Sequence, residues 1–238
     1  MLHLVFTQPR AVERILGLYK TQLADVIANR AQDPEEVFAD AILKARFGDH
    51  PRRRPLSEAT LAGLDLESAF AFYRERFADA GDFTFVMVGS VEIEALRTLV
   101  ERYVASLPSL GREESWRDVQ ARPATGPQTI RVSKGIEPKS AVRIYFHGAA
   151  DWNAEQRYHL RSAVEALRIR LRKSLREKQG GTYGVSVSGA LSPAPEPVFN
   201  AQIAFGCAPE NVDPLVEALW EAVASLGAVG ATADELIK

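Results

Sequence analysis

The residue types that could do chemistry are sparse in this sequence, and most lack a partner at a catalytic spacing. Its four histidines are His3, His50, His147 and His159. A helical zinc site for hydrolysis needs two histidines one turn apart beside an acidic residue, as in H-E-x-x-H or H-x-x-E-H. Neither pattern occurs, and His159 is followed at three and four positions by Ser162 and Ala163. We therefore expect this chain to bind no metal or other cofactor and to cleave nothing by itself.

The single cysteine, Cys207, excludes an internal disulfide and a cysteine-rich zinc site. It lies at the end of an apolar run without a nearby histidine, so we interpret it as a small buried hydrophobe. The G-x-S-x-G nucleophile motif and the glycine-rich nucleotide loops are also absent from the sequence. The residues by themselves indicate no self-contained catalytic machinery.

One pair remains, Arg176 and Tyr183, on either side of a Gly180-Gly181 turn. Because the chain reverses at this turn, the two side chains could meet where a helix passes into a strand. A guanidinium and a phenol hydroxyl both donate hydrogen bonds that strengthen as a carbonyl oxygen becomes an oxyanion. On spacing alone, ordinary roles are favoured: an arginine that interacts with the helix dipole and a tyrosine that packs on a sheet.

The elements around this pair form a second segment that begins with strands. We predict strands at 129–133 and 141–147, then a long amphipathic helix whose leucine stripe runs from Leu160 to Leu175. Gly180-Gly181 ends that helix, because glycine adopts the left-handed conformation common at helix ends. Further strands follow at 183–189 and 198–207, and a last helix begins at Asp213-Pro214.

The first segment is predicted to hold two strands, Leu2–Thr7 and Asp82–Val88, and four helices. Asp33 and Asp65 are the expected N-caps of two of these helices. A sheet of two strands is marginally stable, so we expect exposed strand edges, apolar helix faces and self-association. Residues 109–128 are rich in glycine, proline and polar residues, which places a linker at 116–128 between domains at 1–115 and 129–238.

Composition excludes several classes of protein. The chain has 238 residues, 46% of them hydrophobic and 25% charged, as in globular domains. Its net charge of −2 gives no electrostatic footprint for nucleic acid. No apolar run approaches the roughly 20 residues that span a bilayer. Helices alternating with strands that carry one polar face predict an α+β fold, with antiparallel sheets that are each covered by helices on one face.

Thr232 and Glu235 have the spacing of a capping box, with Leu236 opening an apolar face. A helix that starts so close to the last residue indicates a chain cut from a larger protein. The alternative is a natural C-terminus with a chance T-x-x-E.

Three blocks of the sequence, in order, resemble the pitrilysin/insulinase family of zinc metallopeptidases, the inverzincins with H-x-x-E-H. The first block joins residues 72–77, 83–89 and 96–108; the second is 175–185, with its arginine and tyrosine; the third joins 209–213 and 230–236. One departure occurs at Gly89-Ser90-Val91-Glu92, where many members have Gly-Asp-x-Asp. We expect Ser90 to cap the same helix.

The resemblance implies parts of two consecutive pitrilysin-like domains, from the half of a bacterial peptidase that does not bind zinc. In this family two halves close around the substrate. The zinc motif lies in the N-terminal half, as a fused or separate chain, and the arginine–tyrosine pair of the other half reaches across the chamber. By resemblance, Arg176 and Tyr183 are then catalytic and act on the scissile carbonyl of a peptide or small unfolded protein, and zinc is bound in the other half.

Bacterial members of this kind are often periplasmic, so the resemblance also implies a periplasmic location. The competing hypothesis is a non-catalytic scaffold or interaction subunit of the same family. A third possibility, from the residues alone, is a stand-alone α+β module with an unknown ligand. The retained Arg176 and Tyr183 favour the peptidase half over a pure scaffold, which has no need of an oxyanion-directed pair.

Overall fold

The structure is a computed structural model that describes residues 1–177 and 182–236, apart from the side chains of Arg176, Glu177, Tyr183, Asp234 and Leu236. The chain divides into two compact units, unit 1 at Met1–Lys134 and unit 2 at Gly135–Lys238. The two units differ in their secondary structure. None of the described helices is long and apolar enough to cross a bilayer.

Unit 1 is a set of helices. In chain order they are α1 (Leu2–Thr7), α2 (Glu13–Arg30), α3 (Pro34–Phe47), α4 (Glu58–Ala62), α5 (Leu66–Arg76), the short 3-10 helix η1 (Ala80–Asp82) and α6 (Ile93–Tyr103). Asp33 accepts the N–H of Glu35 at 2.8 Å, and Asp65 accepts the N–H of Ser68 at 2.7 Å. The helix starts predicted at these two residues are therefore confirmed. Ser90 is not a cap: α6 begins after Glu92, without a side-chain capping bond.

The predicted strand at Leu2–Thr7 is wrong, because these residues form helix α1. Short apolar runs do not distinguish strand from buried helix. The deciding contact is tertiary: the Phe6 ring packs edge-on against Phe77 and Phe83, with centroids 5.1 and 5.0 Å apart. Since unit 1 offers no paired strand among its described residues, an α-helix satisfies the backbone of this segment internally.

The predicted strands at Asp82–Val88 and 129–133 are also wrong. Asp82 ends η1, and 83–88 has no regular secondary structure, with Val86 79% and Val88 96% exposed. These residues have strand-like composition, but a strand needs a hydrogen-bonded neighbour and the described residues of unit 1 supply none. The exposed apolar segment agrees with the prediction that this half of the chain lacks a complete sheet.

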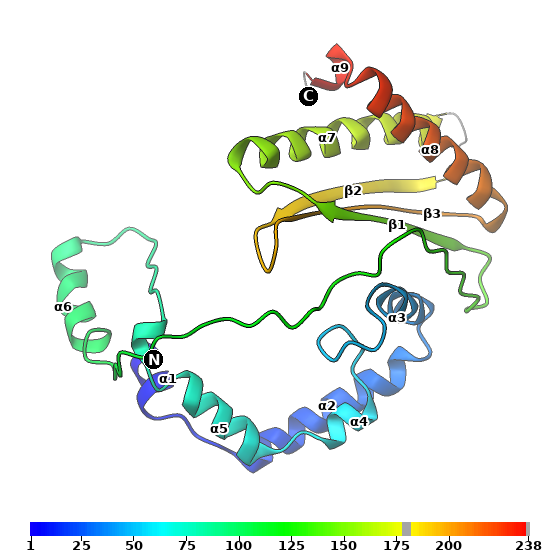
Figure 1. Cartoon of the computed structure of the whole chain (residues 1–238). Coiled ribbons are helices and arrows are strands. Elements are labelled where there is room, and N and C mark those ends of the chain that lie inside the picture. Colours follow the sequence, from blue (N-terminus) through cyan, green and yellow to red (C-terminus); the bar gives the residue numbers. More distant parts are fainter. Residues whose placement is uncertain (178–181, 237–238) are drawn as a thin grey trace. The chain divides into compact units, whose positions relative to one another are not determined.

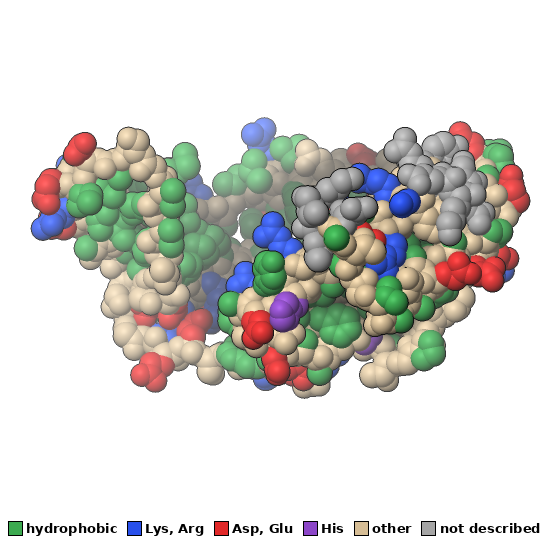
Figure 2. Space-filling view, turned by 90° about the horizontal axis from the view of Figure 1, so that it is seen from above, with side chains coloured by type: hydrophobic (Ala, Val, Ile, Leu, Met, Phe, Trp, Pro, Cys, Tyr) green, Lys and Arg blue, Asp and Glu red, His purple; other side chains and the backbone are tan. Residues whose placement is uncertain are grey.

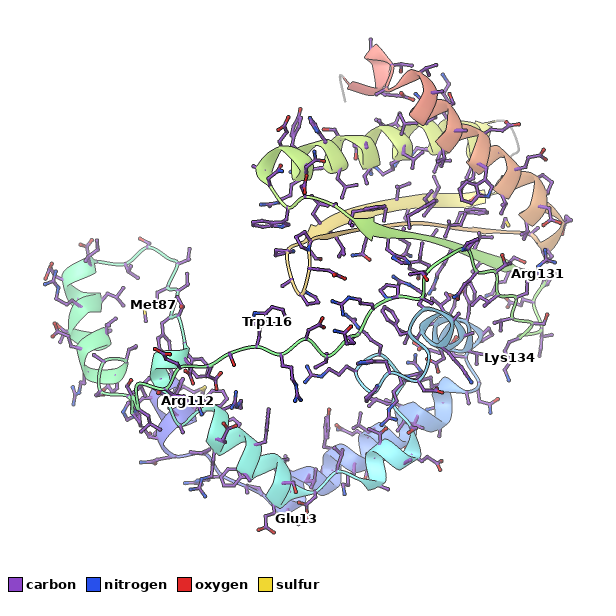
Figure 3. The ribbon with its side chains drawn as sticks, in the orientation of Figure 1. Glu13, Met87, Arg112, Trp116, Arg131 and Lys134 are labelled. Atoms are coloured by element: carbon purple, nitrogen blue, oxygen red, sulfur yellow. The ribbon has the colours of Figure 1, made fainter. Side chains whose placement is uncertain are left out.

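Hydrophobic side chains remain exposed around α6 as well (Figure 2). A shallow apolar hollow there is lined by Leu2, Met87, Leu96, Leu99, Val100, Tyr103 and Val104. Beyond α6 the chain has no regular helix or strand until Ser140. Trp116 lies on this stretch with 71% of its surface exposed (Figure 3).

Unit 2 is an antiparallel sheet with helices packed on one face (Figure 1). Its elements are β1 (Ser140–Ala149), α7 (Ala154–Glu177), β2 (Thr182–Ser192), β3 (Val198–Cys207), η2 (Pro209–Asn211), α8 (Val212–Val229) and α9 (Ala233–Leu236). The strand order is β1-β3-β2, so β3 pairs with both neighbours. The predicted strands at 141–147, 183–189 and 198–207 and the two long helices are confirmed, as is the α+β class.

The core of unit 2 lies between the sheet and helices α7 and α8. Its buried members are Leu171, Leu175, Ile203, Phe205, Cys207, Leu215, Ala218, Leu219 and Ala222. The leucine stripe of α7 and the alternating residues of β3 therefore meet as the two periodicities predict.

Candidate functional site

The sequence-predicted pair lies at the corner where α7 passes into β2. Arg176 is the last residue but one of α7, and Tyr183 is the second residue of β2. The side chains of both residues, and the Gly180-Gly181 turn between them, lie outside the described part of the chain. Backbone placement thus agrees with the predicted helix-to-strand corner.

A β-bulge sets the backbone at Tyr183. Thr182 pairs with Cys207 and Gly184 pairs with the adjacent Gly206, so Tyr183 is an extra residue without a partner of its own on β3. The Thr182 hydroxyl closes the bulge, since it donates to the Gly184 carbonyl at 3.1 Å and accepts the Gly184 N–H at 3.2 Å. Bulges are frequent beside active sites, where they redirect one side chain. Apart from the nearby Gly184, no residue type in this segment predicts the bulge.

Close packing fixes α7 against β2. A methyl group at Gly189 of β2 would lie 2.7 Å from Cγ2 of Val164 on α7, so glycine is required for this approach. Leu171 and Leu175, on the turns that lead to Arg176, have no exposed surface. The last described turns of α7 are therefore anchored in the core.

A second anchor, which the sequence reasoning missed, holds α7 from its other flank. The Arg170 guanidinium donates to both carboxylate oxygens of Glu235 at 2.9 and 2.7 Å and to the Gly230 carbonyl at 2.9 Å. Glu235 also accepts the Thr232 N–H at 2.8 Å, which is the glutamate contact of the predicted capping box. The hydrogen bonds from Arg170 hold the pKa of Glu235 at about 2.

The other candidate residues have structural contacts. His50 contacts the Val119 carbonyl through Nε2 at 2.8 Å and accepts the Arg52 N–H on Nδ1 at 3.2 Å. Within the described ranges, no three His, Cys, Asp or Glu side chains come together as a metal site. Cys207 is buried as predicted, and burial raises the pKa of its thiol.

The chain is similar to one described protein family and to named relatives. The family described as Peptidase M16 inactive domain matches residues 63–238. The probable zinc protease PqqL of Haemophilus influenzae is 26% identical over 224 residues, which cover 88% of this chain and 24% of that protein. This chain therefore spans about a quarter of the length of that relative.

Two solved structures carry the same fold. The crystal structure of the periplasmic protease PqqL from Escherichia coli matches with a TM-score of 0.77 and 26% identity, over 94% of this chain and 25% of that one. The crystal structure of the peptidase M16 inactive domain from Pseudomonas fluorescens matches with a TM-score of 0.68 and 18% identity, over 96% of this chain and 55% of that one.

Proposed function

Because the chain belongs to the peptidase M16 family and matches its inactive domain, we propose that it is the substrate-binding part of a zinc metalloendopeptidase that hydrolyses peptides or small unfolded proteins. The family match identifies it as part of the half that carries the domain described as inactive. Residues 1–115 would then end one pitrilysin-like domain, 116–128 would link the domains, and 129–238 would form most of the second. The zinc-bearing N-terminal half is the partner, fused or separate.

Relatives of this chain are named zinc proteases, and we place the zinc ion in that partner half. The E. coli relative is described as a periplasmic protease, and we propose the same compartment for the complete protein. Cell fractionation of the source organism tests the location.

In the proposed reaction, Tyr183 and Arg176 act on the substrate's carbonyl groups. Negative charge develops on the scissile oxygen as a peptide bond is attacked, and the Tyr183 hydroxyl would donate a hydrogen bond to that oxygen. Arg176 would donate to a neighbouring carbonyl and so orient the peptide. The bulge at Tyr183 supports this proposal, because it gives this residue a backbone position without a partner of its own on β3, at the start of the strand that follows α7.

The test is a Tyr183→Phe substitution in this chain combined with its zinc-bearing half. Loss of one oxyanion donor typically costs about 100- to 1000-fold in turnover. We expect kcat to fall by that factor with little change in KM, since the bond strengthens mainly in the transition state. Arg176→Ala should lower kcat and raise KM.

Tyr158→Phe is the matched control, because Tyr158 is an exposed tyrosine on α7. It should leave both constants unchanged. Full turnover in a folded Tyr183→Phe variant would reject the oxyanion role and leave Tyr183 as a residue that packs on the sheet.

A further inference from the structure

The outer edge of β2 is an unprotected strand edge. Within the described residues β2 pairs with β3 and has no partner on its other side, where an edge strand presents unpaired N–H and C=O groups. Natural edges are usually protected by charged residues or proline. Thr182–Ser192 contains neither over its 11 residues, whereas the opposite edge, β1, carries Arg143 and His147.

Helix α7 borders this edge. The contact of Val164 with Gly189 places α7 over β2, and the edge-on contact of Trp220 with Phe146, 5.8 Å between centroids, places α8 over β1. The two helices contact each other and cover the same face of the sheet (Figure 1). The flank of α7 that faces away from α8 therefore lies on the side of the free edge of β2.

That flank is rich in arginine. Arg170 marks the opposite flank, because it binds Glu235 and the Gly230 carbonyl. Arg161, Arg168 and Arg172 are spaced by seven and four residues and share the other flank. Glu165 lies among them: it pairs with Arg168, and Arg168, followed by Arg172 and Arg161, lowers its pKa. Three cations thus surround one carboxylate, and Arg161 and Arg172 are exposed.

We propose that the free edge of β2 and this arginine flank form a docking surface for an acidic, extended peptide segment, which adds to the sheet as a further strand. The strand edge would bind the peptide backbone whatever its sequence, and the arginines would select glutamate and aspartate side chains. The inference rests on the proposed function and deepens it, because it assigns a class of substrate to the same half.

Two features favour this occupant. Among the described side chains of β2, the exposed ones at Ser186, Ser188 and Ala190 are small, so they leave this part of the edge accessible and offer no aromatic surface on which nucleic acid bases could stack. The surface is also continuous with the proposed site: β2 begins at Thr182, next to Tyr183, and Arg176 follows Arg172 by four residues on α7. A peptide along β2 would reach the proposed catalytic corner.

The test measures binding of a synthetic peptide, in which glutamate alternates with threonine, to the whole chain without the zinc-bearing half. The Arg161→Glu/Arg172→Glu variant should bind about tenfold more weakly. Arg52→Glu/Arg53→Glu is the matched control, since it makes the same charge change on an exposed loop, and should stay within about twofold. Salt should weaken binding, because the arginines are exposed to solvent.

Two further peptides separate strand pairing from simple charge attraction. A peptide with the same side chains but N-methylated at alternate amides cannot pair as a strand, and should bind about tenfold more weakly. A peptide in which lysine replaces each glutamate should not bind. On peptide binding, hydrogen exchange should slow at the β2 amides and remain unchanged at those of β1.

Equal binding of the N-methylated peptide, equal binding of the lysine peptide, or protection at β1 would overturn the proposal, as would an equally tight single-stranded oligonucleotide. These measurements involve no turnover. A negative result in the peptide-binding test therefore leaves the Tyr183→Phe test unaffected. A negative result in the Tyr183→Phe test likewise leaves the binding results interpretable.

Discussion

The two units differ in how their apolar residues are satisfied. In unit 2, four leucines of α7 and α8 have no exposed surface, because a three-stranded sheet lies against them. In unit 1 the described buried residues are Phe6, Ile42, Leu107 and Asp79, and many apolar side chains of its helices are exposed. The proportion of apolar residues is similar in the two units. A paired sheet, and not hydrophobic content, separates a closed core from an open one.

Unit 1 contains a buried polar cluster around Asp79. The buried Asp79 carboxylate accepts the N–H groups of Arg112 at 2.8 Å and Gly81 at 2.9 Å, and these bonds, led by that of Arg112, hold its pKa at about 2. The Arg112 side chain (Figure 3) pairs with Asp82 and Glu75. This cluster ties the segment after α6 to the end of α5.

The sharpest test of the comparison is one leucine truncation in each unit. Leu219→Ala in unit 2 should lower the free energy of unfolding by about 2–5 kcal/mol, because it leaves a cavity in a closed core. Leu99→Ala, at a half-exposed position of α6, should change it by less than about 0.5 kcal/mol. Hydrogen exchange resolved along the chain measures the free energy of unfolding of each unit within the whole protein. Equal losses would mean that unit 1 has a closed core after all.

A smaller loss is expected from Glu235→Gln in unit 2. The substitution leaves the largely buried Arg170 guanidinium without its carboxylate, which should cost about 1–3 kcal/mol and release α9 from α7. Glu94→Gln, in an exposed pair with Arg97, serves as control and should cost less than about 1 kcal/mol. Urea unfolding followed by circular dichroism measures both. Equal losses of stability in the two variants would mean that the Arg170–Glu235 pair contributes no more than an exposed ion pair.

Acid should weaken both units, through one carboxylate in each. Asp79 and Glu235 have folded pKa values of about 2, below their ordinary values of 3.8 and 4.5. A lowered folded pKa stabilises the protein fully above the ordinary value, and this contribution is lost as pH falls toward the folded pKa. Asp79→Asn should thus lower Tm at pH 7, and its difference from the parent should shrink between about pH 4 and 2. A Tm difference that does not depend on pH would indicate that the substitution acts by disturbing local packing and not by removing the charge of Asp79.

The smallest effect on stability should come from the exposed segment of unit 1. Val86→Lys/Val88→Lys should change the free energy of unfolding by less than about 0.5 kcal/mol, because both side chains are exposed. The same change should reduce self-association, since it removes exposed apolar surface. Light scattering over a range of concentrations measures it. A parent chain that stays monomeric at all concentrations would contradict the self-association itself.

The comparison also explains what the sequence could and could not predict. Helix starts at Asp33 and Asp65 were predictable because a cap is a local contact. The strands at 141–147 and 183–189 were predictable because apolar and polar residues alternate along them, and each pairs with β3. Residues 2–7 and 83–88 were not, since the outcome depends on whether a neighbouring strand is present. The register that makes Tyr183 a bulge depends on β3 and is not encoded in residues 182–184 alone.

The strand order β1-β3-β2 has a consequence for how the protein is made. β3 is the last of these three strands to leave the ribosome, yet it is the one to which both others bond. Until Val198–Cys207 emerges, β1 and β2 have no partner and no sheet of any size can form in unit 2. A nascent chain halted before residue 198 would therefore lose the whole sheet, not one third of it, and would expose two unpaired strands to chaperones and proteases.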